Sequence, residues 1–199
     1  MLDKYFTVNI HEYFINEETQ CFLDELIESF DCSIKNVEVD GFLKKSAKEF
    51  AKKGQAATYL VFANEDNPVF VGYFTLAIKP ITIPKQLVSS KNARKFERVC
   101  RLNEEEGTYH FSAFLIAQIG KNYNIAPEDQ IKGKELLEIA EGEIARIKVS
   151  VGGIAAFLEC EKDSRLISFY ENANYKYFGE RISIKKENST LYLKYIKTI

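Results

Sequence analysis

The stretch IAQIGKNYNIAPEDQIKGKELLEIA, residues 116–140, decides the fold of this chain. It begins as an apolar run and ends with the apolar spacing of an amphipathic helix. The loop between the two parts holds one proline, Pro127, and one glycine, Gly133. Such a loop is either an anion cradle, with backbone N–H groups aimed at the phosphates of a cofactor, or only a turn. Which of the two it is decides whether the chain is an enzyme.

The rest of the 199 residues predicts one α/β domain, residues 1–199, with helices on both faces of a mixed sheet. The nearly continuous apolar run 109–120 predicts a strand at the centre of that sheet. Gly72, inside an apolar run, predicts a bulge or a close backbone approach. Asn16, Asp40 and Asp163 are predicted helix N-caps. Strands are expected at 5–10, 58–63, 69–78, 109–120, 154–161, 177–184 and 191–199, helices at 16–30, 40–54, 89–102, 136–147 and 163–175, and turns at 64–68 and 185–190.

Composition excludes several classes of protein. The net charge of −2 argues against a polyanion binder that works by bulk electrostatics. No apolar run approaches the roughly 18–20 residues of a membrane span, and no signal peptide is recognisable, so we expect a cytoplasmic protein without membrane contact. The four cysteines are widely spaced and predict free thiols. The two histidines, His11 and His110, lie too far apart to suggest a metal site.

A basic segment interrupts the predicted sheet within residues 80–108. Residues 85–101 include six basic side chains and one acidic side chain, Glu97, so the local charge is +6 − 1 = +5. One interpretation is a contact with RNA phosphates, and the other is a solvated helix face, which charge runs usually are. The side chains that would make the RNA contact are Lys91, Arg94, Lys95 and Arg98.

The order of the elements, with FYENANY (residues 169–175) after the penultimate helix-forming run, resembles the GNAT superfamily of acyl-CoA-dependent N-acetyltransferases. The resemblance covers almost the whole chain and implies a mixed, mostly antiparallel, twisted sheet between two helix layers. FYENANY is similar to the family's Phe/Leu-Tyr-Glu-x-x-Gly-Phe. It places Tyr170 on the usual catalytic tyrosine and Asn174 on the glycine, at a site past a helix end where Asn tolerates left-handed backbone.

The pyrophosphate loop of the family, Gln/Arg-x-x-Gly-x-Gly/Ala followed by two leucines, is matched less closely. The distance from Tyr123 to Gly133 is about four residues longer than in the family. In the preferred alignment Gly133 is the last Gly/Ala, Glu128 stands at the Gln/Arg position and Ile131 stands at the first Gly. In the alternative alignment Gln130 is the Gln, Gly133 is the first Gly and Glu135 replaces the second.

The resemblance implies a set of site residues. Tyr170 would protonate the departing CoA thiolate, and its match within FYENANY favours this role over that of a packed aromatic side chain. No general base is evident, and Glu159 and Glu161 are candidates beside water or an already neutral amine. Residues implied in acetyl-CoA binding are Gln118, Ile119 and Lys121 through their main chain, Lys132, Gly133 and Lys134 at the helix start, and Asn172.

Two functions follow as hypotheses. The first is an N-acetyltransferase that uses acetyl-CoA and no metal, with direct attack by an amine in a ternary complex. Its acceptor is a small amine, a protein amino group or, as in GNAT toxins, aminoacyl-tRNA, and the resemblance also implies a homodimer as one assembly open to the chain. The second is a domain with the same fold that binds acyl-CoA or a partner protein without turnover.

Overall fold

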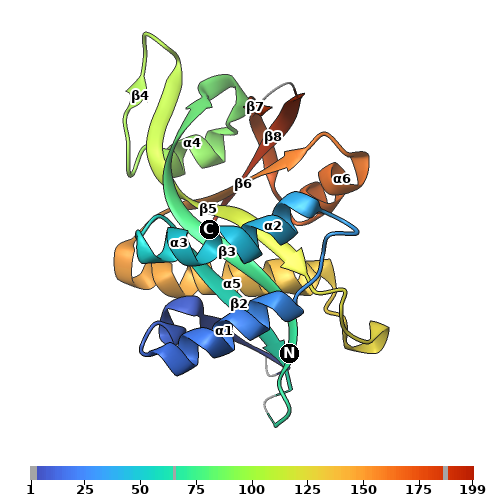
Figure 1. Cartoon of the computed structure of the whole chain (residues 1–199). Coiled ribbons are helices and arrows are strands. Elements are labelled where there is room, and N and C mark those ends of the chain that lie inside the picture. Colours follow the sequence, from blue (N-terminus) through green and yellow to red (C-terminus); the bar gives the residue numbers. More distant parts are fainter. Residues whose placement is uncertain (1–3, 65, 186–187) are drawn as a thin grey trace. The chain divides into compact units, whose positions relative to one another are not determined.

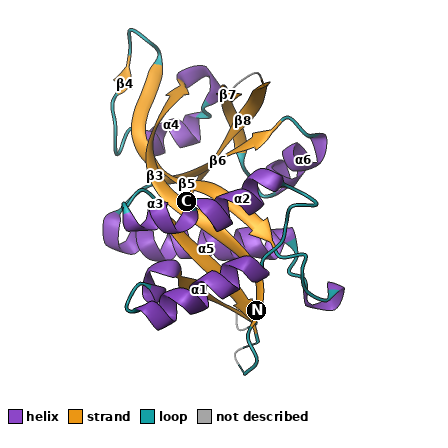
Figure 2. Cartoon of the chain, in the orientation of Figure 1, coloured by secondary structure: helices purple, strands orange, loops and turns teal. Residues whose placement is uncertain are grey.

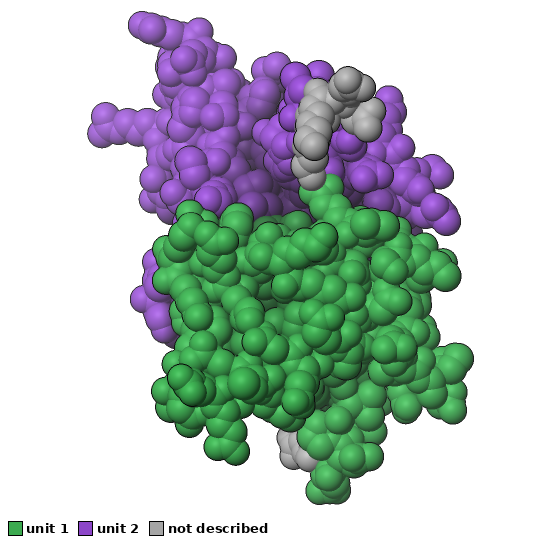
Figure 3. Space-filling view, viewed as in Figure 1, with its two compact units in different colours: residues 1–77, 117–143 green, residues 78–116, 144–199 purple. Residues whose placement is uncertain are grey.

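The computed structural model describes residues 4–64, 66–185 and 188–199. The chain divides into two compact units (Figure 3). Unit 1 consists of Met1–Ala77 and Ala117–Glu143, and unit 2 consists of Ile78–Ile116 and Ile144–Ile199. The prediction of one domain stays a prediction.

The described residues form a mixed sheet of eight mostly antiparallel strands, together with six α-helices (Figure 2). The strand order is β1-β2-β3-β5-β6-β8-β7, and β4 pairs with β5. The predicted fold class and the central place of the apolar run 109–120 are therefore confirmed. The strands are β1 (Tyr5–Asn9), β2 (Ala57–Ala63), β3 (Val69–Pro84), β4 (Leu102–Asn103), β5 (Thr108–Lys121), β6 (Ala155–Glu161), β7 (Lys176–Lys185) and β8 (Asn188–Thr198).

Helices cover both faces of the sheet within unit 1. Neighbouring residues of a strand point to opposite faces, and in β3 the Tyr73 hydroxyl donates to the Val39 carbonyl of α2 at 2.6 Å. A Cβ placed on the preceding residue, Gly72, would lie 3.2 Å from Leu136 Cδ2 of α5. Consequently α2 and α5 lie on opposite faces (Figure 1). The α-helices are α1 (Glu17–Ser29), α2 (Val37–Lys45), α3 (Ala47–Lys52), α4 (Ser90–Phe96), α5 (Gly133–Val151) and α6 (Ser164–Asn172).

Gly72 combines both features that its place in the sequence predicts. The pairing of β2 with β3 shifts register between Val61 and Phe62, opposite Gly72, which is a β-bulge. A Cβ at Gly72 would also lie only 2.8 Å from the carbonyl oxygen of Gly120 in β5. Glycine is therefore required here because β3, β5 and α5 approach one another too closely for a side chain.

Capping side chains set the helix boundaries. Asn16 caps α1 by accepting from the Thr19 N–H at 2.9 Å, and Asp163 caps α6 by accepting from the Arg165 N–H at 2.7 Å; both predictions are confirmed. The predicted cap at Asp40 is wrong. Asn36 caps α2 by accepting from Glu38 and Val39, whereas Asp40 lies inside the helix and accepts from the Cys32 N–H at 2.9 Å.

The predicted interruption of the sheet over 80–108 is wrong at its start. Strand β3 continues to Pro84 before the 3₁₀ turn Lys85–Leu87 begins. The physical reason is alternation: Ile81 and Ile83 are buried in the core of unit 2, and Thr82 between them is exposed. The two prolines in this run suggest a break, so the alternation of buried and exposed residues that marks a strand is hard to recognise from the sequence. The turn predicted at 185–190 includes residues 186–187, which lie outside the described residues, as does residue 65 of the turn predicted at 64–68.

A buried asparagine at the end of β5 joins three parts of unit 1. Asn122 is 1 % exposed. Its amide donates to the Phe70 carbonyl at 2.9 Å, and its Oδ1 accepts from the Asp31 N–H at 3.1 Å and the Asn124 N–H at 3.0 Å. One side chain thus satisfies three backbone groups that the strands and α1 leave without partners in regular structure.

We predict that Asn122→Ala lowers the free energy of unfolding by about 2–4 kcal/mol, because buried backbone groups lose their partners. Urea unfolding followed by circular dichroism measures the change. Asn124→Ala is the matched control, because it keeps its backbone N–H and loses only an exposed bond to the Ser29 carbonyl. Equal stability of the two variants would contradict the role given to Asn122.

Candidate active site

The end of β5 provides main-chain groups beyond its pairing with β6. The parallel pairing joins Phe114–Ile116 to Ala156–Leu158. Gln118, Ile119 and Lys121 lie farther along β5, in unit 1, and each is partly buried. Their main-chain groups are therefore in a segment that this pairing does not use.

The loop 122–132 is anchored at both ends. Asn122 fixes its start, and the Tyr123 N–H donates to the Asp31 carbonyl at 2.8 Å. Pro127–Asp129 form a single 3₁₀ turn, and Ile131 near the end of the loop is 0 % exposed. In the preferred alignment Ile131 stands where the family has its first glycine, so here a buried apolar side chain pins the loop to the core of unit 1.

Helix α5 begins at Gly133 between two lysines. Lys132 and Lys134 are exposed, and Lys134 Nζ lies 3.7 Å from Glu138 Oε1. A helix start offers unpaired N–H groups and a partial positive charge. With two lysines added, the start of α5 has the chemistry of a phosphate site.

A carboxylate already lies at this helix start. Glu135 Oε2 accepts from the Lys132 N–H at 3.0 Å, and the hydroxyl of Tyr5, on β1, is 3.4 Å from the same oxygen. The pKa of the Lys121 ammonium group is lowered, mainly by burial, and the charge of Glu135 opposes this shift. No pattern in the sequence indicates a role for Tyr5, and Glu135 enters the predictions only as a substitute for a glycine in the alternative alignment.

Tyr170 lies in unit 2, near the end of α6. It is 7 % exposed, and its ring centroid is 6.1 Å from that of Tyr175 at an interplanar angle of 71°. Burial raises the pKa of the Tyr170 phenol above its ordinary value, and the charge of Cys160 on β6 contributes in the same direction. At neutral pH Tyr170 is therefore a neutral phenol that has a proton to donate.

The residues after Tyr170 follow the family pattern in backbone as well as in sequence. Asn172 is the last residue of α6 and is exposed. Asn174 has φ +67°, the left-handed conformation expected past a helix end.

One candidate base has a partner. Glu159 forms an ion pair with Arg181 of β7, with Arg181 Nη2 2.6 Å from Glu159 Oε2. Glu161 at the end of β6 is exposed. The ion pair holds the Glu159 carboxylate in place, so Glu161 is the less constrained of the two.

The basic segment lies in unit 2, where α4 packs through Phe96. Lys91, Arg94 and Arg98 are exposed, whereas Lys95 donates to the Thr198 hydroxyl at 3.0 Å. Among the described residues, no carboxylate forms an ion pair with Arg94 or Arg98. These two side chains are therefore available for a polyanion, while Lys95 has a structural role.

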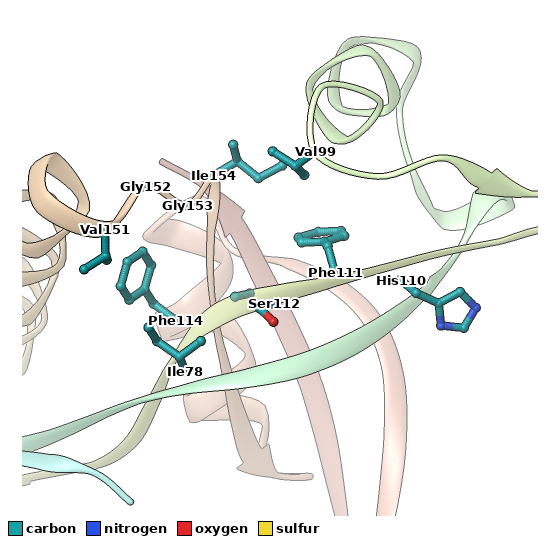
Figure 4. A pocket seen from close by; sticks show the side chains of 11 residues that line it. Ile78, Val99, His110, Phe111, Ser112, Phe114, Val151, Gly152, Gly153 and Ile154 are labelled. Atoms are coloured by element: carbon teal, nitrogen blue, oxygen red, sulfur yellow. The ribbon is translucent and has the colours of Figure 1, made fainter. Parts of the chain in front are cut away.

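Unit 2 also holds a pocket of about 310 Å³ (Figure 4). The rings of Phe111 and Phe114 point into it, and Val99, Val151 and Ile154 are on its wall, whereas the ring of His110 points away. None of the residues predicted for the site lines it. Its wall is largely apolar, so it lacks the convergent polar groups of a reaction centre.

The structure brings six predicted site residues together in unit 1, at the end of β5 and the start of α5: Gln118, Ile119, Lys121, Lys132, Gly133 and Lys134. Tyr170 and Asn172 lie together on α6 of unit 2. The structure thus defines two clusters, one suited to phosphate and one that holds a buried proton donor. Among the described residues, no group of three or more His, Cys, Asp and Glu side chains could hold a metal ion.

Solved structures identify the fold. AtaT in complex with acetyl-methionyl-tRNA matches with a TM-score of 0.60 and 13 % identity, over 94 % of this chain and 93 % of that one. A Tyr-to-Phe mutant of KacT matches with a TM-score of 0.59 and 16 % identity, over 98 % and 95 %. AtaTR bound with acetyl-CoA matches with a TM-score of 0.55 and 14 % identity, over 96 % and 94 %.

The fold expected from the resemblance to the GNAT superfamily is therefore confirmed, since this chain has the fold of the toxin AtaT and of KacT. At these identities the likeness concerns the fold alone. No family model and no curated protein sequence matches the chain. No helix in the described part of the chain is long and apolar enough to cross a membrane.

The burial of Tyr170 generates a prediction about pH. The folded state keeps the phenol neutral, whereas the unfolded chain ionises it near pH 10. The stability that this burial contributes is therefore complete below about pH 10 and is lost as the pH rises further. We predict that the stability difference between wild type and Tyr170→Phe shifts against wild type by about 1.4 kcal/mol from pH 8 to pH 11.

Urea unfolding of both proteins at the two pH values measures this shift, and the other tyrosines cancel in the comparison. A difference that does not change with pH would show that Tyr170 is not held as a neutral phenol.

Proposed function

We propose that the chain is a cytoplasmic N-acetyltransferase that transfers the acetyl group of acetyl-CoA to a primary amine by direct attack in a ternary complex. The observation that carries the proposal is the combination of this fold with a lysine-flanked helix start that follows β5 after the loop 122–132. The start of α5 supplies N–H groups and charge for the pyrophosphate, through Lys132, Gly133 and Lys134. Solved structures of the same fold that hold acetyl-CoA support the choice of co-substrate.

Different residues of the chain would bind the co-substrate and transfer the protons. The main chain of Gln118, Ile119 and Lys121 would hold the pantetheine arm by strand-like hydrogen bonds, and Asn172 would contact the same ligand from α6. The acceptor amine attacks the thioester carbonyl carbon, the C–S bond breaks and CoA leaves as a thiolate. The neutral phenol of Tyr170 gives that thiolate its proton. The proton that the amine loses goes to water or to Glu161.

For the acceptor we propose the amino group of an aminoacyl-tRNA, in preference to a small amine or a protein amino group. AtaT, of the same fold, has been solved with acetyl-methionyl-tRNA. The exposed Lys91, Arg94 and Arg98 on and beside α4 would hold RNA phosphates locally, although the net charge of the chain is −2.

A second function is favoured by one specific observation. Glu135 places a negative charge where the pyrophosphate is expected. A domain with this fold that binds acyl-CoA weakly, or a partner protein, without turnover is the alternative. It differs from the enzyme in releasing no thiol.

We predict that Tyr170→Phe lowers turnover by roughly 10²–10⁴-fold, the range for loss of a general acid, while acetyl-CoA binding stays. Release of CoA thiol in the presence of aminoacyl-tRNA measures turnover, and calorimetry measures binding. Tyr13→Phe, at a half-buried tyrosine in the 3₁₀ turn Ile10–Tyr13, is the matched control and keeps wild-type turnover. Wild-type turnover in a Tyr170→Phe protein that binds acetyl-CoA would refute the catalytic assignment.

We also predict that the chain arrests cell-free translation only when acetyl-CoA is present. Arg94→Gln and Arg98→Gln should each reduce the slope of log affinity for tRNA against log salt by about 1, because each removes one phosphate contact. Lys53→Gln, at an exposed lysine paired with Glu49 in unit 1, is the control. Translation that continues with acetyl-CoA present would count against the tRNA acceptor, and an unchanged salt slope would count against the basic segment.

A further inference from the structure

The side chain of Glu135 occupies a donor that the proposed phosphate site needs. In both alignments of the loop with the GNAT pattern, Lys132 is one of the residues between the Gln/Arg position and the last glycine. Its N–H is therefore one of the cradle's donors, and here it donates to Glu135 Oε2 at 3.0 Å. A phosphate oxygen that binds this N–H has to displace the carboxylate.

The surroundings of Glu135 favour this bound position of the carboxylate. The Tyr5 hydroxyl lies 3.4 Å from the same oxygen, 130 residues away in sequence. Lys121, at the end of β5, contributes a positive charge that interacts with Glu135. Glu135 thus has a backbone donor and a phenol within reach, and the charge of an ammonium group acts on it. A phosphate would use the same three kinds of partner.

We propose that Glu135 is an intramolecular competitor of the acetyl-CoA pyrophosphate, so that the Lys132 N–H exchanges the carboxylate for a phosphate when the co-substrate binds. The inference rests on the proposed function and deepens it, because it assigns a residue that sets the affinity of the site. Glu135 is not catalytic. It lowers the affinity for acetyl-CoA in both the ground state and the transition state. Glu135 therefore affects the KM of the reaction and not its kcat.

A purely structural reading of the same contact makes a different prediction. An acidic or amide side chain three residues into a helix commonly accepts from the backbone N–H at the helix start. If that is its only role, a glutamine serves equally well, because its carbonyl oxygen accepts the same hydrogen bond. The Glu135→Gln substitution therefore keeps the cap and removes only the charge.

The experiment compares acetyl-CoA binding by wild type, Glu135→Gln and Glu25→Gln, using calorimetry at one salt concentration. Glu25 is the matched control, because it is an exposed glutamate on α1 of the same unit and its substitution changes the net charge equally. We expect Glu135→Gln to bind acetyl-CoA about tenfold more tightly than wild type, as removal of one charge repulsion of about 1.4 kcal/mol would give. Its KM for acetyl-CoA should fall by the same factor while kcat stays, and Glu25→Gln should stay within about twofold of wild type.

Each result decides a different point. Binding by Glu135→Gln that is equal to or weaker than wild type overturns the competition, and so does an equal gain in Glu25→Gln, which would make the effect one of net charge. If wild type does not bind but Glu135→Gln does, the competition is upheld in its strongest form. If none of the three proteins binds acetyl-CoA at millimolar concentration, the proposed function itself fails. Unchanged circular dichroism spectra confirm that the variants are folded.

Discussion

The close approach of Gly72 in β3 to Gly120 in β5 is the constraint on which the rest of unit 1 depends. A Cβ on Gly72 would meet the Gly120 carbonyl at 2.8 Å and Leu136 of α5 at 3.2 Å. A Cβ on Gly120 would meet Val39 of α2 at 2.8 Å and the ring of Tyr73 at 3.1 Å. Two glycines thus let one helix layer close down on each face of the same pair of strands. Because α5 packs this tightly, its first turn is fixed beside the end of β5, where the proposed phosphate site lies.

The same tight packing explains why the polar groups at the end of β5 have hydrogen-bond partners. Where the strand stops, Asn122 takes over three backbone hydrogen bonds, and the loop returns to the core through Ile131. A rigid loop holds its N–H groups in place, and this favours anion binding because little order has to be gained. It also gives Glu135 a fixed donor. The packing of α5 therefore both forms the proposed phosphate site and positions the carboxylate that competes for it.

Much of this fold is predictable from sequence, because the apolar periods of β5, α5 and β6 are strong and local. The errors have identifiable physical causes. Asp40 is a residue type that commonly caps helices, but Asn36 comes earlier and its side chain accepts from two backbone N–H groups. The end of β3 alternates correctly through Ile81 and Ile83, but its prolines suggest a break. At the site, the role of Tyr170 could be predicted from the residues around it in the sequence. The role of Glu135 depends on Tyr5, 130 residues away, and no local pattern reveals such a partner.

The central claim is that the start of α5 holds the phosphates of acetyl-CoA, and amide NMR tests it at the atoms concerned. In ¹⁵N-labelled protein titrated with acetyl-CoA, the backbone amides of Lys132 and Gly133 should shift saturably, since a phosphate oxygen replaces a carboxylate or water as acceptor. Gly41, on the other face of unit 1 with nothing within 4 Å of its Cβ position, should stay unchanged. Amides of Lys132 and Gly133 that do not move at saturating acetyl-CoA would contradict the account.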